Sequence, residues 1–121
     1  MMTGIADLEI PPLLDAFYRR VRRDALLGPV FADAVEDWPE HLGRLADFWS
    51  SVMLMTGRYK GQPVLAHVRH LDRITPAMFD RWLALWADTT RRRLSVAGAA
   101  AMQDKAARIA GSRQAALARA N

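Results

Sequence analysis

Apolar residues recur at spacings of three and four along most of the chain, a period typical of helices that bury one face. The first such stretch covers residues 8–27, with arginines mostly on its opposite side. Its apolar positions are Leu13, Leu14, Phe17, Tyr18 and Val21. Gly28-Pro29 breaks the pattern, so a helix end is expected before it and a short helical turn through Phe31 after it.

The start of the next helix is marked by its capping residues. Asp37 can cap the helix, Pro39 suits the first turn, and Glu40 stands three residues after the cap, as in a capping box. This helix is predicted to run to about Thr56 and to end at Gly57. One stripe on it holds His41, Leu45, Phe48 and Val52, flanked by Trp38, Leu42 and Trp49.

A loop over residues 57–63 and a short segment over 64–71 precede a further helix, which Thr75 and Pro76 open. Its predicted inner face carries Phe79, Trp82, Leu83 and Trp86. An alanine-rich last helix is predicted from Ser95, with Met102, Ala106, Ile109, Arg113 and Leu117 roughly in line. The sequence contains no β-alternating segment of useful length and no repeat. It therefore predicts an all-α fold, one domain over residues 1–121 with its core in about 8–118.

The composition excludes several kinds of metal and cofactor site. The chain has 121 residues and no cysteine, which excludes disulfides, cysteine-bound zinc, iron–sulfur clusters and thioether-linked haem. No segment resembles a signal peptide or a membrane helix, so a cytoplasmic protein without membrane insertion is expected. Residues 89–121 hold seven bases and one acid, against ten bases and twelve acids before them. A solvated helix face is favoured over binding to nucleic acid or to an anionic membrane surface for this basic tail.

Three histidines and several aromatic residues are the candidate chemistry. A neutral imidazole of His67 could ligate haem iron, although a histidine at the core edge is the more common situation. His70, three residues on, could share a metal ion with it, but no third ligand is near. Tyr18, His41 and Trp82 offer O–H or N–H donors to an iron-bound diatomic ligand, or they are ordinary core residues. Cations that could meet haem propionates are Arg44, Arg58, Lys60 and Arg69.

An ordered set of segments resembles the truncated haemoglobins of group III. They are residues 17–22, 27–31, 38–42 (Trp-Pro-Glu-His-Leu), 47–51, 56–63 (Thr-Gly-Arg-Tyr-Lys-Gly-Gln-Pro) and 79–86. By the order and spacing of these segments, the resemblance covers about residues 11–115. The resemblance implies a shortened globin fold, with two helices packed over two around haem b.

The same resemblance implies roles for individual residues. His67, four residues after Pro63, aligns with the proximal iron ligand, and His70 does not. Tyr18, His41 and Trp82 align with the polar distal residues. The expected cofactor contacts are Phe31, Leu45, Phe48, Trp49, Arg44 and Tyr59.

Three functions remain open on these residues. The first is reversible binding of O2 and other diatomic ligands, for storage or delivery. The second is an enzyme on the same iron, either peroxidase-like or detoxifying nitric oxide, which needs an external electron donor. The third is a haem-free helical interaction module that uses the basic last helix.

Overall fold

The structure is a computed structural model that describes residues 4–60 and 75–120, with side chains described up to residue 111. The predictions made for the segment 64–71, including those for His67, His70 and Arg69, lie outside the described residues. Its elements in chain order are η1 (Asp7–Glu9), α1 (Ile10–Arg23), α2 (Gly28–Ala34), α3 (Trp38–Leu54), α5 (Pro76–Arg93) and α6 (Val96–Ala120).

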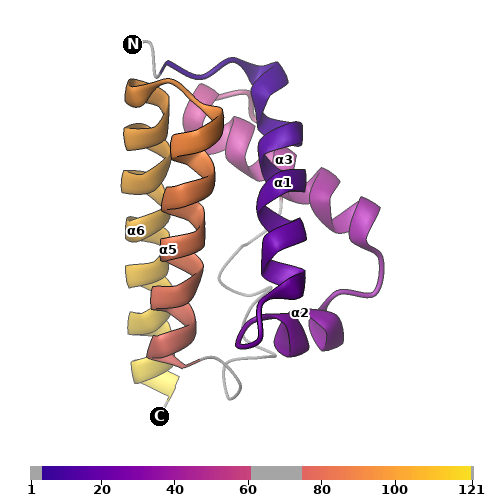
Figure 1. Cartoon of the computed structure of the whole chain (residues 1–121). Helices are drawn as coiled ribbons and strands as arrows, with labels where there is room; N and C mark the ends of the chain where they lie inside the picture. Colours follow the sequence, from indigo (N-terminus) through magenta and orange to yellow (C-terminus); the bar gives the residue numbers. More distant parts are fainter. Residues whose placement is uncertain (1–3, 61–74, 121) are drawn as a thin grey trace.

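The helices form two packed pairs. Helices α5 and α6 lie side by side, and α3 crosses α1 at an angle (Figure 1). Because α1 also packs along α5, it joins the two pairs into one bundle. This arrangement confirms the all-α class and the predicted two-over-two packing. No helix in the described part of the chain is both long enough and apolar enough to cross a membrane.

The core is centred on large side chains that are almost fully buried. Phe17 and Val21 of α1 have no exposed surface, and Trp86 of α5 is 1% exposed. Met102 and Ala106 of α6 are also completely buried, as their predicted alignment required. The indole N–H of Trp86 donates to the carbonyl oxygen of Met102 at 3.0 Å and so ties α5 to α6 inside the core.

Residues 4–9 close one end of the bundle. The carboxylate of Asp7 accepts two hydrogen bonds of 2.9 Å from the guanidinium of Arg58, just after α3. The hydroxyl of Ser95, before α6, donates to the carbonyl oxygen of Gly4 at 3.2 Å. The segment therefore fastens the end of α3 to the start of α6.

Helix starts were predicted well, because side-chain caps define them. Asp37 accepts from the backbone N–H of Glu40 at 3.1 Å, and Thr75 accepts from that of Met78 at 3.2 Å. The hydroxyl of Ser95 likewise accepts from the N–H of Gly98 at 3.0 Å. The reciprocal half of the capping box is wrong, since the carboxylate of Glu40 pairs with Arg44 instead.

Two predicted helix ends are wrong. The stretch 8–27 is a short 3-10 helix followed by α1, which ends at Arg23 because Asp24 adopts an extended conformation. The carboxylate of Asp24 then accepts from the backbone N–H groups of Leu26 and Leu27, both at 3.0 Å. Helix α3 ends at Leu54, two residues before the predicted Thr56, because Met55 adopts the left-handed conformation.

The backbone conformation at position 55 suits glycine better than methionine. Its φ is 59°, and its side chain is 89% exposed, so little packing opposes a change. Because the left-handed region costs an L residue about 1–2 kcal/mol, we expect Met55→Gly to raise the free energy of unfolding by about 0.5–1 kcal/mol. Urea unfolding measures this. Met55→Ala keeps the Cβ atom and is the control; an equal gain from it would contradict the backbone explanation.

Gly28 is required by a close approach. A Cβ atom there would lie 2.8 Å from the carbonyl oxygen of Arg22, whereas one at Gly43 would meet nothing within 4 Å. We expect Gly28→Ala to destabilise the fold by about 1–3 kcal/mol. Gly43→Ala, in the exposed interior of α3, should stabilise it by about 0.5–1 kcal/mol. Thermal unfolding of the pair tests both signs, and a stable Gly28→Ala protein would refute the close contact.

Candidate functional site

Two of the predicted distal residues lie in ring contact. Tyr18 of α1 is 5% exposed, and its ring lies edge-on to that of His41, in the first turns of α3, with 6.1 Å between centroids. Phe31 of α2 is 5.8 Å from the Tyr18 ring, and Trp38 is 5.9 Å from it. Three helices thus bring one phenol and one imidazole together inside an aromatic cluster.

The third predicted distal residue, Trp82, is joined to this cluster through Phe17. The Phe17 ring lies edge-on to Tyr18 at 4.7 Å and to Trp82 at 5.5 Å. Trp82 also stacks on Trp86, with 5.9 Å between centroids and 3° between planes. The predicted distal residues therefore border one aromatic surface, although Trp82 is not a direct neighbour of His41 among the ring contacts.

The nitrogen donors of His41 and Trp82 are without a partner in the part of the chain that the structure describes. Both side chains are half-buried, and neither makes a side-chain hydrogen bond to residues 4–60 or 75–111. The indole of Trp86 differs, because it is bound to a carbonyl oxygen inside the core. Half-buried donors beside an apolar surface are suited to a small polar ligand.

His41 is held in its neutral form at physiological pH. Its burial, and then the positive charge of Arg44, lower the pKa of His41 from the usual 6.5. A neutral imidazole carries one N–H donor and one nitrogen acceptor, so His41 can either donate to a ligand or accept from a neighbour. Donating a hydrogen bond to a ligand does not require a charged imidazole.

The predicted wall residues fall into two groups. Leu45 and Phe48 on α3 and Phe31 on α2 are partly buried and pack against the core, which leaves part of each apolar side chain uncovered. Trp49 is only 2% exposed and stacks on Trp86 at 4.8 Å, so it belongs chiefly to the core. Tyr59, after α3, lies edge-on to Phe48 at 5.4 Å. Its backbone N–H donates to the hydroxyl of Ser51 at 2.8 Å, which fixes it beside α3.

The candidate cations differ in exposure and in the acid with which each forms an ion pair. The side chain of Arg44 is 71% exposed and is paired with Glu40 one turn away. Arg58 is committed to Asp7, away from the cluster of Tyr18 and His41. Among the described residues, no group of three histidines, cysteines or acids could hold a metal ion.

Sequence reasoning identified Phe17 only as a core position. Its helical spacing with Leu13 and Val21 gave that result, but no sequence signal shows that one ring contacts Tyr18, Trp82 and Trp86 together. Arg22 was likewise placed on a solvent-facing side. Its guanidinium lies 4.6 Å from the Trp38 ring centroid, over the outer side of the cluster.

The lowered pKa of His41 predicts a pH-dependent stability. His41 binds its proton at a lower pH in the folded protein than in the unfolded chain. Titration of His41 therefore lowers the free energy of unfolding as pH falls below 6.5 and leaves it unchanged at higher pH. Wild type should therefore lose more unfolding free energy than His41→Gln between about pH 7.5 and 5.5. Denaturant titrations at each pH measure the difference. Arg44→Gln, which removes the second cause, should give an intermediate slope, and parallel curves for all three proteins would disprove the shift.

Comparisons with known proteins agree with the fold. No family model matches the sequence. The curated Group 3 truncated hemoglobin ctb of Campylobacter jejuni is 36% identical over 84 residues, which cover 66% of this chain and 65% of that protein's length.

A solved structure extends the likeness to nearly the whole chain. The crystal structure of group III truncated hemoglobin from Campylobacter jejuni superposes with a TM-score of 0.81 at 31% identity, covering 96% of this chain and 94% of that one. With this identity over this coverage, and with the same helical architecture, the chain belongs to the group III truncated haemoglobins.

Proposed function

We propose that this globin binds haem b through His67 and holds O2 or another diatomic ligand at the iron. In this proposal Tyr18, His41 and Trp82 donate hydrogen bonds to the bound ligand. The observation that carries it is the pair of half-buried ring nitrogens on His41 and Trp82, which lack partners among the described residues and border the buried Tyr18–Phe17 pair.

The exposed parts of the apolar side chains fit a flat cofactor. Among the described residues, partly buried apolar side chains of α2, α3 and α5 pack against the core: Phe31, Leu42, Leu45, Phe48, Val52, Trp82 and Leu83. Cofactor sites are lined mainly by such groups, with few polar atoms to orient the ligand. The arrangement supports Phe31, Leu45 and Phe48 as cofactor contacts, with Trp49 supporting them from the core. Arg44 and Tyr59 remain predictions at the rim.

The three proposed distal residues differ in the hydrogen bonds that their side chains can make. Haem, when bound, supplies an iron on which O2 acquires partial negative charge, which hydrogen-bond donors stabilise. The Tyr18 ring has four aromatic neighbours, which restrict the position of its hydroxyl oxygen. The indole of Trp82 can only donate. The imidazole of His41, on the more open α3 side, can donate while neutral.

An enzyme function would use the same residues. Donors that stabilise bound O2 can also polarise an O–O bond, and an external electron donor would then be required. Steady peroxide-dependent oxidation of a dye that is lost in Tyr18→Phe would identify the protein as a peroxidase-like enzyme. Rapid haem bleaching without turnover would identify it as a binding protein.

Optical spectra and O2 release test the binding proposal. We expect stoichiometric haem uptake and a sharp Soret band that shifts with carbon monoxide in the reduced protein. His67→Ala should weaken or alter this band. Because a hydrogen bond to a charged group contributes about 1.5–3 kcal/mol, Tyr18→Phe should speed O2 dissociation about tenfold or more.

Thr90→Val is the control for that experiment. It also deletes a buried hydroxyl, one on α5 that donates to the carbonyl oxygen of Trp86 at 2.9 Å and accepts from the side chain of Gln103 at 3.1 Å. Its O2 dissociation rate should stay near that of wild type. Absence of stoichiometric haem uptake would overturn the proposal. Equal dissociation rates in Tyr18→Phe and wild type would instead remove Tyr18 from the ligand contacts.

A further inference from the structure

The outer face formed by α1 and α5 carries more positive charge than its acids can balance. Its five arginines are Arg20, Arg23, Arg81, Arg91 and Arg92, and its acids are Asp24 and Asp88. Asp88 alone accepts hydrogen bonds from three guanidiniums, those of Arg20, Arg91 and Arg92, at 2.8 to 3.0 Å. Hydrogen bonds from Arg91 and Arg20 lower the pKa of Asp88 to about 2, so this carboxylate stays ionised and the surplus of arginines persists.

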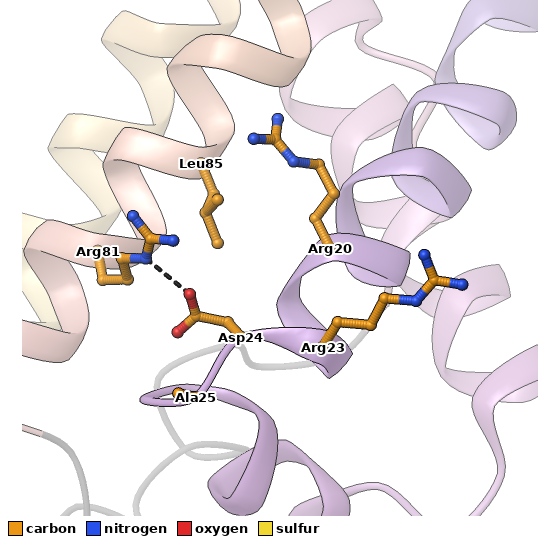
Figure 2. Close-up of a pocket in the computed structure, with 6 residues that line it drawn as sticks. All are labelled: Arg20, Arg23, Asp24, Ala25, Arg81 and Leu85. Atoms are coloured by element: carbon orange, nitrogen blue, oxygen red, sulfur yellow. Dashed lines mark hydrogen bonds and ion pairs between the residues drawn. The ribbon is translucent and has the colours of Figure 1, made fainter.

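A hollow lies on this face where α1 ends. It has a volume of about 430 Å³ and is lined by Arg20, Arg23, Asp24, Ala25, Arg81 and Leu85 (Figure 2). Leu85 of α5 is only 6% exposed and lies between the arginines of the two helices. Neither Tyr18 nor His41 lines it, so the hollow is separate from the proposed haem pocket.

Donor groups around the hollow are left unused. Arg81 donates to Asp24 through Nε at 2.7 Å, and its two terminal nitrogens have no acceptor among the described residues. Arg20 uses only Nη1, on Asp88 and Thr89. Arg23 makes no side-chain hydrogen bond or ion pair within residues 4–60 and 75–111, and its exposed side chain extends from the end of α1 (Figure 2).

Asp24 balances the charge of only one of these arginines, Arg81. Its carboxylate is 6% exposed, with one oxygen bound to Arg81 and the other to the backbone N–H groups of Leu26 and Leu27. Burial acts to raise the pKa of Asp24, but these hydrogen bonds outweigh it and leave the pKa below its usual value. The acid therefore serves to position Arg81 and the turn.

We propose that this hollow binds a small molecule through its phosphate group. Guanidinium forks match phosphate oxygens in pairs, and the surplus positive charge suits a ligand with several negative charges. The hollow is open to solvent, and its volume of about 430 Å³ leaves room for a small ligand. Arg81 and Arg20 contact the phosphate from α5 and α1, and Arg23 turns inward to complete the site. Leu85 and Ala25 offer apolar surface to the rest of the ligand.

Calorimetric titration with pyrophosphate at constant ionic strength tests the proposal on the full chain, with and without haem. We expect saturable one-to-one binding that Arg23→Gln weakens about tenfold, the loss of one charge-assisted contact. Arg23 is the informative position because it has no described partner, so its removal should leave the fold intact. Arg108→Gln is the matched control, since Arg108 pairs with Asp104 on α6 and lies outside the hollow.

Backbone amide shifts locate the binding, and further ligands identify its source. Pyrophosphate should shift the amides of Ala25, Leu26 and Leu27 in nuclear magnetic resonance spectra. Tighter binding of adenosine diphosphate than of pyrophosphate would indicate a nucleotide, and equal binding would indicate a free polyphosphate. Unsaturable binding, or equal weakening by Arg23→Gln and Arg108→Gln, would overturn the proposal. Because the readout does not involve haem, its failure leaves the oxygen-binding proposal untouched.

Discussion

The packing around Trp86 is the constraint on which the rest of the structure depends. Its indole lies edge-on to Phe17 of α1 at 4.7 Å, stacks on Trp49 of α3 at 4.8 Å, and donates to α6 through the carbonyl oxygen of Met102. One side chain of α5 thus contacts the three other long helices. Since aromatic pairs combine large buried area with preferred geometry, they fix the relative positions of the helices as well as stabilising the core.

The same contacts extend outward to the candidate pocket. The Phe17 ring contacts both Trp86 and Tyr18, and the Trp82 ring stacks on Trp86 directly. The donors proposed to hold a ligand are therefore positioned by the core rather than by loops, which suits hydrogen bonds that must point in one direction. Helix α5 serves two surfaces, because Trp82 faces the aromatic cluster and its neighbour Arg81 faces the hollow.

Sequence reasoning succeeded where the determining interaction is local. Asp37 and Thr75 cap their helices through residues three positions away, and apolar spacing found Phe17 and Met102 in the core. It failed at Asp24 and Met55, neither of which is a residue type that normally ends a helix. Asp24 ends α1 through local hydrogen bonds from the backbone N–H groups of Leu26 and Leu27 and through a contact with Arg81, 57 residues away, and only the second of these is hidden from a local pattern. Likewise, periodicity places Tyr18 and His41 on helix faces but cannot show that those faces meet; only the family resemblance indicated it.

The aromatic cluster also determines what light emission from this protein can report. The chain has four tryptophans, and all of them lie in ring contact within it: Trp38 beside Tyr18 and His41, and Trp49, Trp82 and Trp86 in the stack. No tryptophan monitors α6 or the hollow independently. Intrinsic fluorescence therefore reports on the aromatic core and the candidate pocket together, and quenching on occupation of that pocket would resemble a global transition although the helices remain folded.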